Sequence, residues 1–196
     1  MPAQLRKGDS PVLQTERLVL RFPQPEDAAA MARYVIENRE HLRKGGPARD
    51  GNYYTDLYWL QMAEDIDRDW RADRHCHFIL FDKTDNRTPL GRARLSDFLR
   101  GALHGCNLGY EIAKSHEGRG LMTEALQAAI AHGFGPLNLH RIQAAYRPAN
   151  LRSGRVLERL GFVKEGIAAA YLRVDGRWED HVVTSLTNPH WRDPDH

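Results

Sequence analysis

The first part of the chain shows one strand pattern and then two stretches in which apolar residues recur at helical spacing. Residues 15–21 are rich in strand-forming side chains and predict a first strand. Apolar side chains then recur at helical spacing over residues 31–42 and again over residues 56–71, which predicts two amphipathic helices. Pro25-Glu26-Asp27 supplies the start signal of the first helix, and Gly45-Gly46-Pro47 ends it and begins a loop.

The middle of the chain shows strand patterns. Apolar runs at residues 77–81 and 90–99, separated by a polar turn at residues 83–86, predict an antiparallel hairpin. A third strand at residues 106–112 alternates apolar and polar side chains, so the two sets face opposite sides of a sheet. Gly109 lies inside this strand and indicates either a β-bulge that parts two strands or a place where a ligand lies against the backbone.

The clearest helix of the chain follows this strand. Gly118-Arg119-Gly120 opens a helix whose apolar stripe ends near Gly133. Residues 141–146 predict the next strand. Asn150 is the expected N-cap of a further helix that runs to residue 160, where Gly161 supplies a left-handed stop.

The last segment predicts a hairpin. Asp175-Gly176 stands between strand patterns at residues 170–174 and 178–186, and this dipeptide favours a type I′ turn. The elements therefore follow the order β-α-α-β-β-β-α-β-α-β-β. This order predicts an α/β (α+β) chain built on one mixed sheet.

Composition and charge narrow the class of protein. The chain of 196 residues, 41% hydrophobic and 28% charged, suits one globular domain over residues 1–196, with its core at about 12–188. A net charge of +2 disfavours direct nucleic-acid binding, which usually needs a concentrated basic face. No apolar run is long enough for a signal peptide or a membrane span, so we expect a cytoplasmic protein that does not bind membranes.

The two cysteines, Cys76 and Cys106, form no Cys-x-x-Cys pair. Both are predicted to be buried strand residues, which suits a reducing compartment. His75 and His77 flank Cys76, but no further ligand stands at metal-binding spacing, and no metal site is assigned.

Residues 109–133 combine a strand, a glycine-rich turn and a helix, which suits the binding of a diphosphate. Free backbone amides at a helix N-terminus favour negative charge, and Gly118 and Gly120 let a ligand approach the backbone. The loop continues Gly120-Leu121-Met122, so it is not a P-loop, and no Gly-x-Gly-x-x-Gly motif of a dinucleotide-binding fold is present. Glycines also precede helices in plain turns, and the pattern alone does not decide between the two.

The ordered set of motifs resembles the GNAT acetyltransferases. Their acyl-CoA motif, Gln/Arg-x-x-Gly-x-Gly/Ala between a strand and a helix, corresponds to Ser115-His116-Glu117-Gly118-Arg119-Gly120. Asn150-Leu151-Arg152-Ser153 is similar to the ribosomal-protein alanine acetyltransferase branch, the RimJ/RimL type, and to its RimJ kind in particular. The likeness extends from residue 15 to residue 181. It implies the GNAT acyl-CoA N-acyltransferase fold, a mixed, mostly antiparallel twisted sheet of about seven strands flanked by about four helices.

Two positions depart from the pattern of this family. Ser115 replaces the usual Gln or Arg, which costs little if backbone amides from Glu117 to Leu121 hold the phosphates. Gly45-Gly46-Pro47 stands where RimJ-like proteins tend to carry Trp-Glu-Pro. That loop is expected to border the acceptor site, so the loss of a large aromatic side chain bears on the identity of the acceptor.

The resemblance implies acetyl-CoA as the co-substrate and assigns residues to it. Backbone amides near Tyr110 and Ile112 would stabilise the oxyanion and pair with the pantetheine arm. Asn150 would serve both as a helix N-cap and as a hydrogen-bond partner of pantetheine. The implied acetyl-CoA-binding residues are Tyr110, Ile112, Glu117, Gly118, Arg119, Gly120, Leu121, Asn150 and Ser153.

Acetyl transfer also needs a base that takes a proton from the amine and a group that donates a hydrogen bond to the leaving thiolate. Glu111, on the polar face of its strand, is the first candidate for the base, although a strand-face salt bridge explains it equally well, and His104 is a weaker candidate. Ser153 matches the family position that hydrogen-bonds to the thiolate. Tyr146 is either an alternative donor or a core aromatic.

The family resemblance implies an acetyl-CoA-dependent N-acetyltransferase that acts on the N-terminal α-amine of a protein such as a ribosomal protein, and it further implies ribosome association. The altered loop at Gly45-Gly46 leaves open a small-molecule amine as acceptor, such as an antibiotic, a polyamine or an amino acid. A third hypothesis is a non-catalytic acyl-CoA-binding module. The sequence leaves open whether the protein is a monomer or a homodimer.

Overall fold

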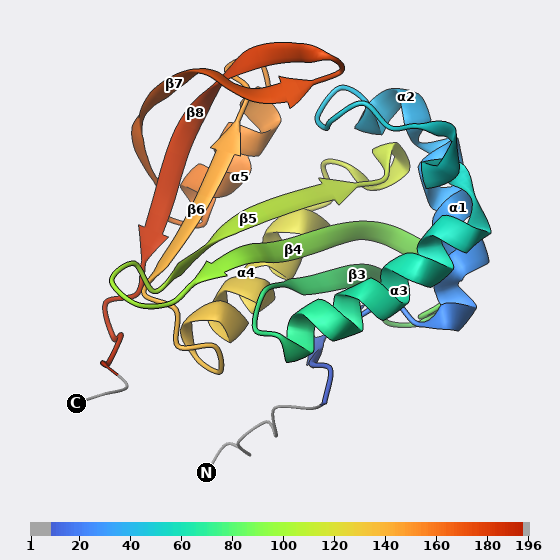
Figure 1. The fold of residues 1–196 in the computed structure, drawn as a ribbon, viewed down its shortest axis with the longest axis horizontal. Helices are drawn as coiled ribbons and strands as arrows, with labels where there is room; N and C mark the ends of the chain where they lie inside the picture. The colour runs from blue at the N-terminus through green and yellow to red at the C-terminus, as the bar shows by residue number, and fades with distance from the viewer. Residues whose placement is uncertain (1–8, 194–196) are drawn as a thin grey trace.

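A twisted sheet of eight strands forms the centre of the computed structural model, which describes residues 9–193 (Figure 1). The two ends of the predicted range 1–196 lie outside the described residues. The spatial order is β1-β2-β3-β4-β5-β6-β8-β7, and only β5 and β6 run parallel within the described part. The strands are β1 (Val12–Gln14), β2 (Leu18–Arg21), β3 (Cys76–Asp82), β4 (Pro89–Leu99), β5 (Gly105–Ile112), β6 (Arg141–Tyr146), β7 (Val163–Val174) and β8 (Arg177–Thr187).

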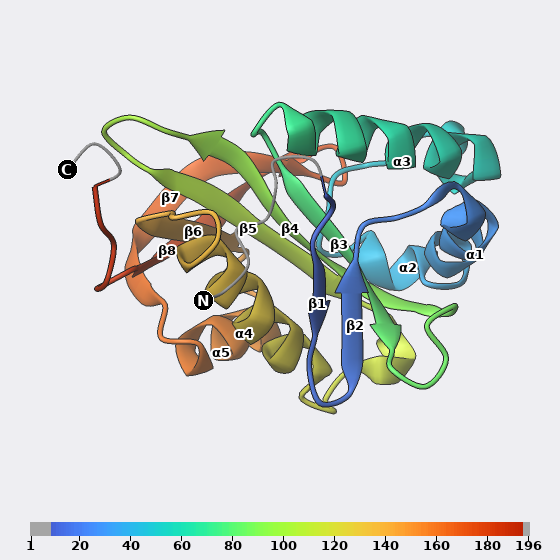
Figure 2. The ribbon, with the colours of Figure 1, turned by 90° about the horizontal axis from the view of Figure 1, so that it is seen from below.

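Five α-helices occur in residues 9–193 and pack on both faces of the sheet (Figure 2). α1 and α3 cover one face, while α4 and α5 cover the other. None of these helices is long and apolar enough to cross a membrane. The helices are α1 (Ala28–Glu37), α2 (Arg39–Leu42), α3 (Asp56–Arg71), α4 (Leu121–Phe134) and α5 (Leu151–Arg159), with 3-10 turns at Pro25–Asp27, Gly51–Tyr54 and Lys114–His116.

The predicted fold class is confirmed, with one strand and one helix more than expected among the described residues. The helix expected over residues 31–42 is in fact two helices, because Asn38 interrupts it. The Asn38 amide donates to the Tyr34 carbonyl and its oxygen accepts from the Lys114 amide. The type I′ hairpin is confirmed, since Asp175 and Gly176 have φ angles of 46° and 84°.

The first turn of α4 is joined to the segment that enters β2 through Glu124. Its carboxylate accepts hydrogen bonds from Thr15 Oγ1 at 2.6 Å, from the Arg17 amide at 2.8 Å and from Arg17 Nε at 2.7 Å. Burial disfavours the charge, but these hydrogen bonds outweigh burial and lower the pKa of Glu124. Glu124 thus fixes the start of α4 against the edge of the sheet.

Glu124→Gln is expected to lower the free energy of unfolding by about 1 kcal/mol at pH 7, because charge-assisted hydrogen bonds become neutral ones and Arg17 is partly screened by solvent. The folded-state pKa is depressed, so this stabilisation exists above the unfolded pKa of about 4.3 and is lost as the pH falls through the folded value. Urea titrations of both proteins at pH 7 and at about pH 3 test this. An equal difference at both pH values would contradict it.

Candidate active site

β5 and β6 separate partway along β5. They pair only between residues 105–107 and 141–143, whereas β5 remains paired with β4 as far as Ile112. Because β5 and β6 are parallel, their carboxyl ends and the N-termini of α4 and α5 lie at the same end of the sheet (Figure 1). Ligands of open α/β sheets bind at such a place.

Of the two interpretations of Gly109, the β-bulge is wrong. Gly109 pairs with Arg94 in regular register, and the register shift of this ladder lies between Ser96 and Leu99. The strands part because pairing with β6 ends at Asn107. A Cβ atom added at Gly109 would meet no atom within 4 Å, so the space beside this backbone is open.

The backbone of β5 directs hydrogen-bonding groups into the gap. The Ala113 amide donates to the Leu90 carbonyl, and bonded and non-bonded residue pairs alternate along an antiparallel ladder. Glu111 therefore bonds to β4, whereas the backbone N–H and C=O groups of Tyr110 and Ile112 point away from β4. These are the groups that the resemblance assigns to the oxyanion and to pantetheine.

The loop before α4 has the geometry of an anion site. Gly118 and Gly120 have φ angles of 76° and 77°, a region that side chains rarely adopt. Among the described residues, the amides of Gly118, Arg119 and Gly120 donate to no backbone carbonyl. With Leu121, the first residue of α4, these amides lie at the positive end of the helix dipole, which fits a diphosphate.

Glu117 differs from the rest of this predicted set, because its amide donates to the Lys114 carbonyl at 3.3 Å. Its side chain forms an ion pair with Arg152 of α5 and lies 3.6 Å from His41 Nε2. Glu117 therefore connects the loop to α5 and α2, and it offers no free amide to a phosphate.

The N-terminus of α5 carries the candidate thiolate donor. Asn150 caps the helix, since its oxygen accepts from the Ser153 amide at 3.2 Å. Ser153 Oγ lies 2.7 Å from Tyr110 Oη, so two hydroxyl groups meet at the edge of the gap. Burial raises the pKa of Tyr110 to about 12, which keeps its hydroxyl protonated. The Tyr146 ring packs against Gly154, where an added Cβ atom would lie 2.9 Å from the ring.

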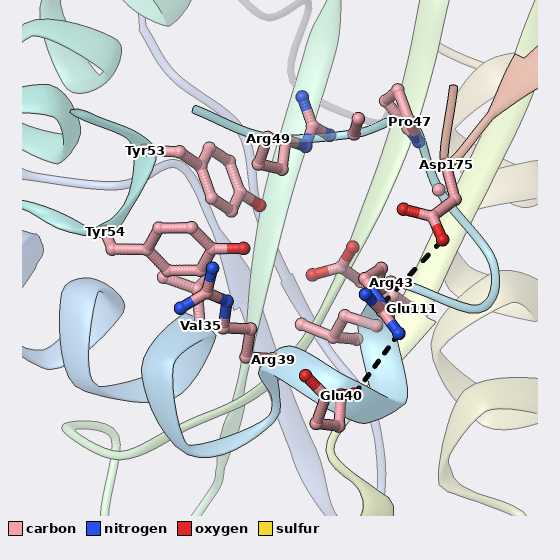
Figure 3. A pocket seen from close by; sticks show the side chains of 13 residues that line it. Val35, Arg39, Glu40, Arg43, Pro47, Arg49, Tyr53, Tyr54, Glu111 and Asp175 are labelled. Carbon is pink, nitrogen blue, oxygen red and sulfur yellow. Dashed lines mark ion pairs between the residues drawn. The ribbon is translucent and has the colours of Figure 1, made fainter. Parts of the chain in front are cut away.

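Glu111 lies on the opposite face of the sheet and faces a pocket of about 200 Å³ (Figure 3). The pocket includes Gly46 and Pro47, so the loop that departs from the family pattern borders it, as expected. Its wall is formed by α1, α2, the loop that follows α2 and the tip of the β7–β8 hairpin. Its other lining residues include Val35, Arg39, Arg43, Tyr53, Tyr54 and Asp175.

The buried guanidinium group of Arg92 holds the Glu111 carboxylate in place. Arg92 Nε and Nη2 lie 2.9 Å and 2.7 Å from Oε1 of Glu111, and Nη2 also donates to Tyr53 Oη at 2.8 Å. Burial alone would lower the pKa of Arg92, but the Glu111 carboxylate raises it instead. The predicted salt bridge of Glu111 thus exists, and the side chain nevertheless faces the pocket.

His104 is wrong as a candidate base. It stands just before β5 begins, whereas the backbone groups of Tyr110 that face the gap lie roughly 20 Å along the strand at about 3.3 Å per residue. Its ring contacts the Gly101 carbonyl and packs against Trp191. The residue type suited proton transfer, but the position excludes it.

Sequence reasoning missed four residues of this region: Tyr34, His41, Tyr53 and Arg92. Each belongs to a different element from Glu111. Arg92 alone left a signal, because it is a charged residue inside an apolar strand. The strand register that brings it opposite Glu111 became known only with the structure.

Ser153 and Glu111, two of the three predicted catalytic residues, therefore lie on opposite faces of the sheet. Ser153 and Tyr110 lie on the face covered by α4 and α5, and Glu111 lies on the face covered by α1 and α3. Such a site can hold a diphosphate-linked thioester on one side and a small polar acceptor on the other.

Known acetyltransferases are similar to this chain over most of its length. The family model "Acetyltransferase (GNAT) domain" matches residues 17–163. The chain is 43% identical to the [ribosomal protein uS5]-alanine N-acetyltransferase of Escherichia coli strain K12 over 179 residues, which cover 91% of this chain and 92% of that protein.

Solved structures of similar proteins share the fold. The ribosomal-protein-S5-alanine acetyltransferase of Vibrio fischeri superposes with a TM-score of 0.88 at 34% identity, over 93% of this chain and all of that one. RimJ of Mycobacterium smegmatis, in complex with CoA-disulfide, superposes with a TM-score of 0.85 at 28% identity, over 95% of this chain and 90% of that one.

Proposed function

This chain belongs to the GNAT acetyltransferase family and is an N-acetyltransferase that uses acetyl-CoA, and from that premise we propose that it acetylates the N-terminal α-amine of a ribosomal protein. The open amides at Gly118–Gly120, beside the gap between β5 and β6, are the observation that carries the acyl-CoA part of this proposal. The 43% identity to a ribosomal-protein-alanine acetyltransferase supports the acceptor.

Backbone groups of the site would bind the coenzyme and stabilise the oxyanion. Amides of Gly118, Arg119, Gly120 and Leu121 would hold the diphosphate, and the edge of β5 would align the pantetheine arm. Backbone amides at Tyr110 and Ile112 would face the oxygen on which negative charge develops. The assignments at the loop rest on the amides of Gly118, Arg119 and Gly120, which donate to no backbone carbonyl among the described residues. Those at Tyr110 and Ile112 rest on the register of β5 with β4.

Two side chains would move or hold protons. Glu111 would take a proton from the acceptor ammonium, directly or through one water, because an amine attacks only when neutral. Ser153 would donate a hydrogen bond to the departing thiolate, whose usual pKa of about 8.5 requires only modest help. The positive end of α5 supports the same negative charge.

The proposal also covers the catalytic unit, the oligomeric state and the cellular compartment of the enzyme. Residues 12–188 would act as one catalytic unit, as a monomer or a homodimer, and the protein would contact the ribosome through its substrate. The cytoplasm suits this role, and the two free, buried cysteines suit a reducing compartment.

The test is a panel of acceptors with the purified protein and acetyl-CoA. Thiol release and mass spectrometry would follow peptides with the N-terminal sequences of ribosomal proteins, the same peptides with blocked N-termini, and small amines such as a polyamine and an aminoglycoside. The proposal expects release only with free peptide N-termini. Release with small amines alone would identify a small-molecule acetyltransferase, and binding of acetyl-CoA without any release would identify a non-catalytic module.

A further inference from the structure

Tyr34 of α1 has a buried hydroxyl group without a hydrogen-bond partner. The residue is only 3% exposed and packs in the cluster that α1 and α3 form on the sheet. Its Oη forms no hydrogen bond of ordinary length and angle with another described residue. A phenylalanine would fill the same space without this polar atom, so packing does not explain the hydroxyl.

An unpartnered buried hydroxyl is costly, because the group loses its hydrogen bonds to water and gains none in return. Few buried polar groups in folded proteins lack a partner, and those that do often belong to functional sites or bind an ordered water. The Tyr34 hydroxyl therefore indicates a polar partner within its reach, either a neighbouring side chain or an ordered water.

The surroundings of this hydroxyl identify the partner. Burial raises the pKa of Tyr34 well above its usual value, and the negative charge of Glu111 raises it further. Among charged side chains, Glu111 and Arg92 act on Tyr34 most strongly. The hydroxyl therefore keeps its proton. Tyr34 packs in the same buried cluster as Tyr53, whose hydroxyl accepts from Arg92 at 2.8 Å, and Arg92 in turn pairs with Glu111.

The two oxygens of Glu111 have different surroundings. Both Arg92 nitrogen atoms lie near Oε1, at 2.9 Å and 2.7 Å. Neither of these Arg92 contacts is made to Oε2. The Glu111 side chain is 25% exposed and lines the pocket that borders the altered loop. Arg92 thus anchors one oxygen and leaves the other for the acceptor.

We propose that Tyr34 is a positioning residue that acts through Glu111: its hydroxyl donates a hydrogen bond to Oε2, directly or through one water, and orients that oxygen toward the acceptor amine. The inference rests on the proposed function of this site. In the step it supports, one proton passes from the acceptor ammonium to Glu111, which leaves a neutral amine and a carboxylic acid. Tyr34 retains its own proton throughout.

Tyr34→Phe tests the proposal, with Tyr58→Phe as the matched control. Tyr58 is a half-buried tyrosine of the same cluster, and it does not line the pocket. Tyr34→Phe is expected to lower kcat about 10-fold and to change the KM for acetyl-CoA by less than about twofold. Its Tm should stay within a few degrees of the wild type, because phenylalanine fills the same buried space. Tyr58→Phe should leave kcat unchanged.

A double-mutant cycle separates this role from a structural one. If Tyr34 acts through Glu111, adding Tyr34→Phe to Glu111→Gln should lower kcat by less than about twofold further. A kcat of Tyr34→Phe close to that of the wild type would overturn the proposal, and so would an undiminished effect in the Glu111→Gln protein. If Glu111→Gln itself leaves kcat unchanged, the base assignment in the proposed function fails as well. A slow Glu111→Gln with a fast Tyr34→Phe rejects only the role of Tyr34.

Discussion

Gly118→Val is expected to raise the Kd for acetyl-CoA by about 100-fold, the largest effect on binding that we predict. Gly118 has a φ angle of 76°, and a β-branched residue either strains that backbone or turns it out of this conformation. In either case the amides that face the diphosphate lose their alignment. The added side chain would also enter the open space above the loop, where no protein atom lies within 4 Å. Isothermal titration calorimetry with acetyl-CoA measures the change.

Gly101→Val is the matched control for this substitution. Gly101 has a φ angle of 68°, also with no atom within 4 Å of an added Cβ, but it lies in the turn between β4 and β5, away from the gap. It should impose a similar backbone strain and leave the Kd for acetyl-CoA unchanged. Equal effects of the two substitutions would show that strain, and not the loop amides, weakens binding.

Ser153→Ala is expected to lower kcat about 10- to 1000-fold with little change in acetyl-CoA binding. The Ser153 hydroxyl lies in the first turn of α5 and meets the Tyr110 hydroxyl at 2.7 Å. Its loss removes a donor to the thiolate, while the diphosphate site at α4 stays intact. Residual activity would come from Tyr110, so Tyr110→Phe should reduce the activity of Ser153→Ala further.

Ser185→Ala provides the control for Ser153→Ala. Ser185 is a buried serine of β8 whose hydroxyl donates to Glu165, on the side of β6 away from the gap. Its replacement should leave kcat unchanged. Steady-state kinetics with a peptide acceptor, together with acetyl-CoA titrations, measure both variants. Wild-type turnover by Ser153→Ala would remove this serine from the mechanism.

The elements that could be predicted are those with a clear cap, apolar stripe or turn dipeptide in their own sequence. α3 begins and ends as expected because Thr55 caps it and its apolar stripe is continuous, and the Asp175-Gly176 turn depends on its own two residues. β1 was missed, because three residues carry too weak a pattern. β7 was expected from residue 170 but starts at Val163, since an exposed edge strand with polar residues shows no clean alternation.

In the site, too, features set by neighbouring residues could be predicted, and features that depend on distant residues could not. The loop at Gly118 and Gly120 and the cap at Asn150 could be predicted, because each depends on neighbours in sequence. The surroundings of Glu111 could not be predicted, because Arg92, Tyr53 and Tyr34 come from three separate elements. The interpretation of Gly109 as a bulge failed for a related reason. The gap arises where pairing to β6 stops, and that is a property of two strands and not of one residue.

A crystal structure of the protein with coenzyme A and a short peptide acceptor tests the central claim most directly. We predict the diphosphate on the amides of Gly118, Gly120 and Leu121, the pantetheine arm along the edge of β5, and the sulfur atom within hydrogen-bonding reach of Ser153 Oγ. The peptide N-terminus should lie in the pocket that Glu111 faces. A coenzyme bound elsewhere, with the gap between β5 and β6 empty, would contradict the account.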